Sequence, residues 1–265
     1  MLHAEFPNDK IMGEESSEAL RSDGQLAQQV LKLVNLVDKD LRLENMFESI
    51  DLGCYSSGKG RFWTIDPIDG TKGFLRGGQY AICLALIENG QSVVAAQACP
   101  NLPRNIKEPK DIGSIFYAAR NQGAFEKGYE SKESRISVSN ISNIENSVFC
   151  ESAESSHSSH LKTEQISKRL NIKNDPIRID SQCKYGLVAR GDANIFLRIP
   201  TDPLYEEKIW DHACGCLLVE ESGGVVTDLD DKPLDFSTGR TLKNNRGILA
   251  TNTQEIHSII LKQLS

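Results

Sequence analysis

Apolar positions along the chain follow two different periods. Between residues 25 and 48, Leu26, Val30, Leu33 and Val37 recur every three or four residues, which predicts one helix with an apolar face. Elsewhere, short apolar runs stand between Gly, Asn, Asp and Ser residues, a pattern typical of strands separated by turns. The chain therefore predicts a fold that contains both helices and sheets.

The first half of the chain predicts consecutive hairpins. Asn89-Gly90 separates two apolar runs and favours a tight two-residue turn. The motif FWTID predicts a strand that ends in an acidic residue. Neighbouring hairpin strands predict mixed or antiparallel sheets in this half. The predicted strands cover residues 62–66, 80–87, 92–98, 114–119 and 124–127.

The second half alternates strands with helices, which is typical of a layered α/β architecture. A polar segment over 139–146 (SNISNIEN) predicts a division into an α+β part, residues 1–140, and an α/β part, residues 141–265. The predicted strands cover 147–151, 177–180, 193–199, 225–227 and 247–251, and the predicted helices cover 160–170, 182–190, 209–222 and 253–264.

Composition and charge exclude several classes of protein. With 265 residues, 39% of them hydrophobic and 25% charged, the chain is long enough to bury a sizeable core. A net charge of −7 argues against a nucleic-acid partner, and the seven cysteines contain no C-x-x-C pair that would indicate a zinc ribbon. We find no signal peptide and no apolar run near the ~20 residues that span a bilayer. We expect a cytoplasmic location, with the nucleus as the alternative, and no membrane partner.

The sharpest chemical motif is Asp66-Pro67-Ile68-Asp69-Gly70, directly after a predicted strand. Proline fixes φ and glycine relaxes it, so the chain can turn sharply at this point. Such a turn can aim two carboxylates and one backbone carbonyl at the same place, and these oxygen ligands suit Mg²⁺. The alternative is an acidic β-turn without a ligand, because Asp, Pro and Gly are common in turns.

Two further acidic positions strengthen the metal hypothesis. Glu14 and Glu15 follow an apolar pair, and Asp211 follows Trp210 at the start of a predicted helix. A solvated acidic loop and a favourable helix-dipole contact are the respective alternatives. If the three positions converge, repulsion among their carboxylates requires two or three bound cations.

These motifs together resemble a known family. The segments WTIDPIDGTKGFLRGGQYAICLALIENG, GEESS and KIWDHACG resemble the lithium-sensitive phosphatases of the inositol monophosphatase superfamily. The continuation TKGFLRG, with ESAESSHSSH, DSQCKYG and PLDFSTGRTL, is similar to its 3′(2′),5′-bisphosphate nucleotidase branch, known from salt tolerance in fungi and plants. The resemblance covers essentially the whole chain. It implies a layered α/β/α/β/α sandwich of the inositol monophosphatase and fructose-1,6-bisphosphatase type.

The resemblance also implies a role for individual residues. Asp69 and Thr71 would be catalytic, with Thr71 orienting the attacking water. Glu15 would support Glu14 or an additional metal ion. The implied Mg²⁺ ligands are Glu14, Asp66, the carbonyl of Ile68, Asp69 and Asp211, and the implied substrate-binding residues are Gly70, Thr71, His157, Ser181, Lys184 and Arg198.

The implied function is Mg²⁺-dependent hydrolysis of adenosine 3′,5′-bisphosphate to AMP and phosphate by a monomer. Its 5′-phosphosulfate relative, 3′-phosphoadenosine 5′-phosphosulfate, would be a second substrate, which connects the activity to sulfate assimilation. One alternative is an inositol-phosphate phosphatase with the same chemistry. Another is a nucleotide-binding form with impaired turnover.

The impaired alternative rests on the N-terminal segment. Family members carry several tens of residues before the GEE motif, including an Asp that pairs with the threonine equivalent to Thr71. Here thirteen residues precede Glu14, and Asp9 lies too close to Glu14 in sequence to be that Asp. We expect such a chain to bind metal and nucleotide better than it turns substrate over, and to leave apolar surface uncovered.

Overall fold

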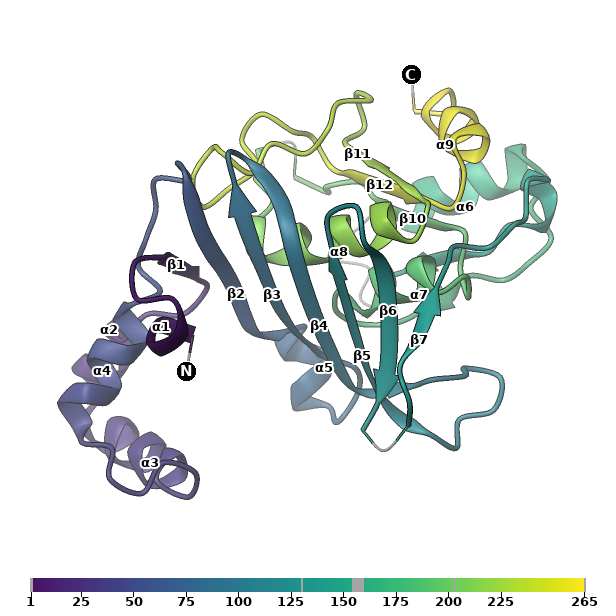
Figure 1. Cartoon of the computed structure of the whole chain (residues 1–265). Coiled ribbons are helices and arrows are strands. Elements are labelled where there is room, and N and C mark those ends of the chain that lie inside the picture. The colour runs from purple at the N-terminus through teal and green to yellow at the C-terminus, as the bar shows by residue number, and fades with distance from the viewer. Residues whose placement is uncertain (1, 130, 154–159, 203, 265) are drawn as a thin grey trace.

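The computed structural model describes residues 2–129, 131–153, 160–202 and 204–264. Its strands form two sheets with helices around them (Figure 1). The helices are α1 (Leu2–Glu5), α2 (Glu18–Ser22), α3 (Gly24–Val34), α4 (Leu43–Asp51), α5 (Thr71–Leu75), α6 (His160–Arg169), α7 (Cys183–Ala189), α8 (Ile209–Glu221) and α9 (Gln254–Leu261).

The first sheet contains seven strands in the order in which they follow one another along the chain. The edge strand β1 pairs with β2 in parallel, and every later pair is antiparallel. The predicted hairpin turn is confirmed, since Asn89 and Gly90 have φ values of 52° and 79°. The strands are β1 (Lys10–Gly13), β2 (Arg61–Asp69), β3 (Ala81–Glu88), β4 (Gln91–Pro103), β5 (Ile112–Ala119), β6 (Gly123–Gly128) and β7 (Ser134–Ile136).

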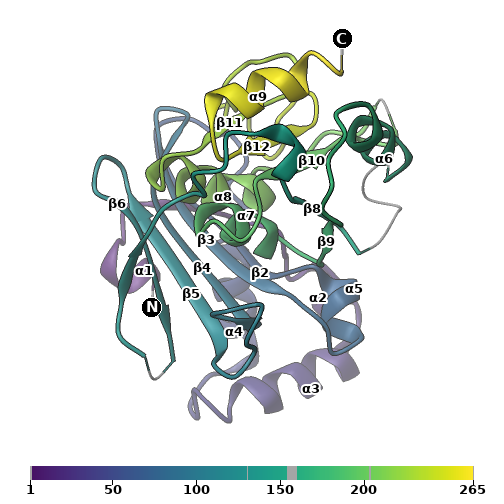
Figure 2. The same ribbon diagram turned by 90° about the vertical axis from the view of Figure 1, so that its right-hand side faces the viewer.

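The second sheet has five strands in the order β11-β12-β10-β8-β9. Helices α7 and α8 lie between the two sheets, and α8 is buried along most of its length (Figure 2). On the far face of the second sheet, Ile166 of α6 and Ile256 and Ile260 of α9 join the apolar side chains of β8, β10 and β12. These strands are β8 (Phe149–Glu151), β9 (Ile177–Arg178), β10 (Ile195–Arg198), β11 (Val225–Thr227) and β12 (Ile248–Thr251).

The predicted layered α/β architecture is confirmed, and the two sheets share one hydrophobic core. That core includes Phe62 and Phe116 of the first sheet, Phe196 of the second, and Leu217 between them. The boundary between the sheets falls between Ile136 and Phe149. The division of the chain at residue 140 stays a prediction, because one large core contains side chains from both parts, although a smaller core lies within the second part alone.

The prediction of a single helix over residues 25–48 is wrong. The structure has two helices, α3 and α4, separated by turns over residues 35–42. The apolar spacing continues across this break, but Leu36 and Val37 are 74% and 91% exposed. Asn35, Asp38 and Asp40 interrupt the helix, since Asn and Asp favour turns over helix interiors.

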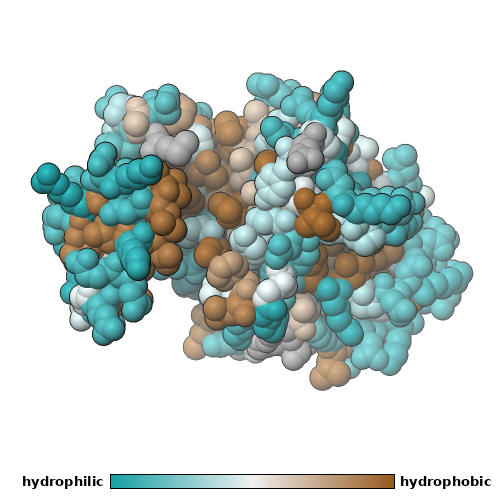
Figure 3. Space-filling model, turned by 90° about the horizontal axis from the view of Figure 1, so that it is seen from below, coloured by the Kyte–Doolittle hydropathy of each residue, from teal (hydrophilic) through white to brown (hydrophobic). Residues whose placement is uncertain are grey.

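The helices α2–α4 form a small cluster beyond the β1 edge, with Ala27, Met46 and Phe47 at its centre. They contact one another more than they contact either sheet. Figure 3 shows apolar side chains among hydrophilic ones on this part and an adjacent hollow with apolar walls. The exposed apolar side chains here include Leu26, Leu33, Leu36 and Val37.

Among the residues that the structure describes, no helix has the length and apolar character needed to cross a bilayer.

Candidate functional site

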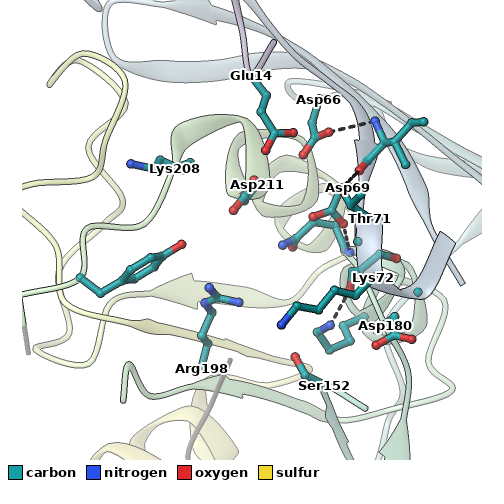
Figure 4. Close-up of a pocket in the computed structure, with 17 residues that line it drawn as sticks. Glu14, Asp66, Asp69, Thr71, Lys72, Ser152, Asp180, Arg198, Lys208 and Asp211 are labelled. Carbon is teal, nitrogen blue, oxygen red and sulfur yellow. Dashed lines mark hydrogen bonds between the residues drawn. The ribbon is translucent and has the colours of Figure 1, made fainter. Parts of the chain in front are cut away.

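Parallel pairing of β1 with β2 brings the first two acidic positions together. The register pairs Gly13 with Ile65, and the N–H of Glu14 donates to the carbonyl of Ile65 at 3.2 Å. The next residues along the two strands are Glu14 and Asp66. Figure 4 shows their carboxylates side by side at the upper edge of a cavity.

The turn after Asp66 positions the carboxylate of Asp66 and the carbonyl of Ile68. The N–H of Ile68 donates to Asp66 Oδ1 at 3.0 Å, and Thr71 Oγ1 donates to the carbonyl of Ile68 at 3.3 Å. Gly70 has a φ of 85°, and a Cβ there would lie 2.7 Å from Cβ of Ser181. Only glycine fits this left-handed position without displacing the segment that carries Ser181.

The third acidic position comes from α8. Asp211 lies in the first turn of this helix, and oxygens of Asp66, Asp69 and Asp211 all lie within 4.8 Å of one another. The carboxylate of Asp69 also accepts the backbone N–H of Gln182. The three acidic positions singled out in the sequence therefore converge, with Glu14 beside Asp66.

An arginine holds two of these elements in place. Arg240 Nη2 donates to the carbonyl of Gly13 at 2.7 Å, and its guanidinium lies 4.5 Å from the ring centroid of Trp210. Gly13 precedes Glu14 and Trp210 precedes Asp211. Arg240 is thus a positioning residue that the sequence reasoning missed, although it lies within the PLDFSTGRTL motif.

Burial and mutual repulsion raise the pKa values of the clustered carboxyl groups. Burial, followed by the charges of Asp69, Glu14 and Asp211, raises the pKa of Asp66 to about 9. Burial is also the main reason that the pKa values of Asp69 and Asp211 rise. A cluster of this kind is stable near neutral pH with bound protons or bound cations, and its all-oxygen donors fit Mg²⁺.

Without divalent cations, we expect the folded chain to lose stability as the pH rises. Asp66 has a pKa of about 9 in the folded chain and about 3.9 in the unfolded chain. Its protonation therefore stabilises the folded state fully below about pH 3.9, and this stabilisation is lost as the pH rises through about 9. Bound Mg²⁺ replaces the protons, so it should raise Tm more at about pH 8 than at about pH 6. Thermal unfolding with Mg²⁺ or EDTA at both pH values measures this. The same Mg²⁺-dependent shift at both would contradict the prediction.

The clustered carboxylates form one side of a cavity of about 360 Å³. The same cavity also contains three lysines and an arginine, so it has an acidic part and a basic part. Its lining residues are Glu14, Asp66, Ile68, Asp69, Gly70, Thr71, Lys72, Gly73, Ser152, Asp180, Ser181, Gln182, Lys184, Arg198, Tyr205, Lys208 and Asp211.

The segment before α7 brings Ser181 and Lys184 to the cavity. Ser181 has a φ of 67°, and its carbonyl accepts from Nζ of Lys184 at 2.5 Å. The same amine donates to the carbonyl of Ile179 at 3.2 Å. Lys184 is only 3% exposed, and burial lowers the pKa of its amine. Lys184 thus holds the backbone that presents Ser181 and Gln182 to the cavity.

Arg198 enters the cavity from β10 and is held by a buried network. Its Nε donates to Glu207 Oε1 at 2.6 Å, and the second oxygen of Glu207 lies 3.2 Å from Nε2 of His212. The hydroxyl of Tyr185 is 2.9 Å from Nδ1 of the same His212. Burial opposes ionisation of Glu207, but the hydrogen bond from His212 and the charge of Arg198 lower its pKa to about 2. The network fixes the guanidinium of Arg198 as a permanent cation.

Most of the predicted site residues line this cavity. His157 lies outside the described residues. Glu15 is not among the residues that line the cavity. Asp9 does not line it either, and its carboxylate accepts hydrogen bonds from Arg61 and Trp63. The sequence reasoning missed other lining residues because, taken singly, they are indistinguishable from surface residues: Lys72, Ser152, Asp180, Tyr205 and Lys208.

Solved structures share the fold of this chain. An IMPase of Thermotoga maritima aligns with a TM-score of 0.62 at 23% identity, covering 99% of this chain and 76% of that protein. An inositol monophosphatase from Anabaena (Nostoc) sp. PCC 7120 gives a TM-score of 0.63 at 21% identity, covering 99% and 81%.

Relatives found by sequence have a higher identity to this chain than these two solved structures have. A 3′(2′),5′-bisphosphate nucleotidase of Schizosaccharomyces pombe is 49% identical over 266 residues, which cover 94% of this chain and 75% of the relative. A relative with the same name from Oryza sativa is 42% identical over 268 residues, covering 94% and 75%. The family model described as the inositol monophosphatase family matches residues 1–265. The resemblance predicted from the motifs is thereby confirmed, and the chain belongs to the inositol monophosphatase family.

Proposed function

We propose that this chain is a Mg²⁺-dependent phosphomonoesterase that hydrolyses adenosine 3′,5′-bisphosphate at its 3′-phosphate, giving AMP and phosphate. The observation that carries the proposal is the convergence of Asp66, Asp69 and Asp211 within 4.8 Å, in a cavity that also contains cationic side chains. The names of the relatives from Schizosaccharomyces pombe and Oryza sativa support a bisphosphate substrate. The 5′-phosphosulfate relative of this nucleotide is proposed as a second substrate.

The carboxylates and one carbonyl are proposed to hold two or three Mg²⁺ ions. The ligands would be Glu14, Asp66, Asp69 and Asp211 with the carbonyl of Ile68, all of which line the cavity. When bound, the ions would lower the pKa of a water molecule and stabilise negative charge on the phosphoryl and leaving oxygens.

The residues at the start of α5 are proposed to orient the reactants. Thr71 Oγ1 donates its proton to the carbonyl of Ile68, so the hydroxyl oxygen can accept a hydrogen bond from water aligned for in-line attack on phosphorus. The N–H groups of Gly70 and Thr71 would hold the phosphoryl oxygens. The water oxygen would bond to phosphorus as the P–O bond to the 3′-oxygen breaks, and the proton that the water loses balances the one that the 3′-oxygen gains on leaving as the ribose hydroxyl.

The basic part of the cavity is proposed to bind the nucleotide. Arg198 is anchored through Nε, so its remaining nitrogens can donate to an anion or a sugar oxygen. Ser181 would contact the nucleotide from the cavity wall, and Lys184 would support this contact by holding the backbone of Ser181. His157 would provide a further substrate contact. The proposed partner is thus a small nucleotide, and we propose that the chain acts as a monomer.

A phosphate-release assay tests the proposal. We expect phosphate release from adenosine 3′,5′-bisphosphate in Mg²⁺, no release in excess EDTA, and inhibition by Li⁺. Inositol monophosphate is the comparison substrate and is expected to react more slowly. Faster reaction with inositol monophosphate would favour an inositol-phosphate phosphatase, and unchanged release in EDTA would contradict the metal mechanism.

A further inference from the structure

The cavity contains one side chain whose surface suits a flat, apolar group. Of the described residues that line the cavity, Tyr205 alone has an aromatic ring, and most of the others have charged or polar side chains. Tyr205 is 44% exposed, so a large part of its surface is open to a ligand although other side chains contact it. The proposed mechanism gives this ring no role.

The backbone of Tyr205 is held by a turn in the segment between β10 and α8. The side chain of Asp202 accepts the N–H of Leu204 at 2.9 Å, and the carbonyl of Asp202 accepts the N–H of Tyr205 at 3.1 Å. An aspartate that closes a turn in this way fixes the local backbone. The position of Tyr205 is therefore defined before a ligand enters.

Arg198 positions the ring of Tyr205. Its guanidinium carbon lies 5.8 Å from the ring centroid, within the range of a cation–π contact, and its Nε is held by the buried Glu207. One guanidinium covers at most one face of a planar ring, so this contact and a stacked ligand are compatible. Figure 4 shows Arg198 across the cavity from Glu14 and Asp66, so the ring that contacts Arg198 belongs to the side away from these carboxylates.

The ring is chemically suited to a nucleobase. Both groups are flat π systems, and stacking between a base and an aromatic side chain is favourable whichever base is present. An inositol ring has no π surface, and its hydroxyl groups require polar partners. A cavity with carboxylates on one side and an aromatic ring on the other therefore suits a substrate that carries both a phosphate and a base.

We propose that Tyr205 is a specificity-determining residue whose ring stacks against the nucleobase while the 3′-phosphate lies at the carboxylates. This inference rests on the proposed function and names the contact that favours a nucleotide over an inositol phosphate. Arg198 would bind the sugar or phosphate groups, and the ring of Tyr205 adds a contact that depends on the base alone.

Two substrates that differ only in the base test this contact. They are adenosine 3′,5′-bisphosphate and 1,4-anhydroribitol 3,5-bisphosphate, which has the same sugar and phosphates with hydrogen in place of the base. For Tyr205→Leu we expect kcat/KM for the nucleotide to fall about 10-fold to 100-fold, the range typical of a base stacked on an aromatic side chain. The value for the base-free compound should change by less than about threefold. Equal losses for both substrates would overturn the proposal.

Two further variants separate the base contact from other effects. Tyr205→Phe keeps the ring and its cation–π contact, so it should retain most of the preference for the nucleotide. Tyr129 is 60% exposed and is not among the residues that line the cavity, so Tyr129→Leu is the matched control and should change neither value. If Tyr205→Phe lost the preference as fully as Tyr205→Leu, the hydroxyl would be responsible and stacking would be refuted.

Equilibrium binding separates this inference from the proposed reaction. Calorimetry in EDTA, where no turnover is expected, compares AMP with ribose 5-phosphate, which lacks the base. The parent chain should bind AMP about 10-fold or more tightly than ribose 5-phosphate, and Tyr205→Leu should lose most of this difference. A preference for AMP that depends on Tyr205, in a chain that releases no phosphate, would reject the proposed function and retain the base contact. No preference for AMP in the parent, or an equal preference in Tyr205→Leu, would reject the inference.

Discussion

Replacing Asp211 with asparagine is expected to reduce Mg²⁺-dependent phosphate release by at least about 10³-fold while the chain remains folded. The oxygens of Asp211 lie within 4.8 Å of those of Asp66 and Asp69, so the substitution removes a charged ligand from the centre of the cluster. Loss of metal-stabilised charge in the transition state is worth several kcal/mol, and ~4 kcal/mol corresponds to the stated factor. Phosphate release from the bisphosphate at saturating Mg²⁺ measures the effect.

The stability of the same variant separates a chemical loss from a folding loss. Asp211 contributes repulsion to a buried acidic cluster in the absence of cations, so Asp211→Asn should raise Tm in EDTA. The exposed Asp175 provides a matched control, and Asp175→Asn should leave both activity and Tm near the parental values. Near-parental activity of Asp211→Asn, or a lower Tm in EDTA, would show that the carboxylate does not act in the metal cluster.

The second large effect concerns stability. Glu207 is 2% exposed and accepts from Nε of Arg198 at 2.6 Å, while its other oxygen lies 3.2 Å from His212. Glu207→Ala leaves the buried guanidinium without its carboxylate, which typically costs ~3–5 kcal/mol. Urea unfolding at neutral pH measures the loss in the free energy of unfolding.

The neighbouring Glu206 is a matched control for this substitution. It is exposed and accepts the hydroxyl of Thr241, so Glu206→Ala should cost about 1 kcal/mol or less. The depressed pKa of Glu207, about 2, stabilises the parent above the unfolded pKa of about 4.3, and this contribution is lost as the pH falls toward 2. The difference in stability between parent and Glu207→Ala should therefore shrink in acid. Equal losses in the two alanine variants would contradict the assigned network.

The acidic cluster could be predicted from sequence because its signals are local. Asp66 and Asp69 stand at the end of an apolar run, with proline and glycine placed to turn the chain, and the structure has a strand and a turn at those positions. Asp211 was found in the same way, at the first turn of an apolar helix. A strand of two-residue period and the turn that ends it are determined mainly by near neighbours.

The contacts that complete the site depend on residues far apart in sequence. In the sequence, Glu207 cannot be distinguished from other acidic residues that precede a helix. Only the structure, in which β10 places Arg198 beside it, shows that Glu207 is the buried partner of this arginine. Arg240 likewise reaches Gly13 across more than two hundred positions of the chain. The break between α3 and α4 was missed for a different reason, since the apolar period continues through turn residues that are exposed when folded.

The strand that brings Glu14 to the acidic cluster is the edge strand β1. It pairs with β2 over four residues, and its other side contacts Gly53 and Tyr55 through two backbone hydrogen bonds. Edge elements of this kind open locally with less free energy than the core requires. A ligand that needs Glu14 raises the free energy of this opening by RT ln(1 + [L]/Kd), about 1.4 kcal/mol for each tenfold excess over Kd. A bound metal ion would therefore slow the exchange of the β1 amide hydrogens with solvent. The proposed ion would thus also hold this edge strand against the rest of the sheet.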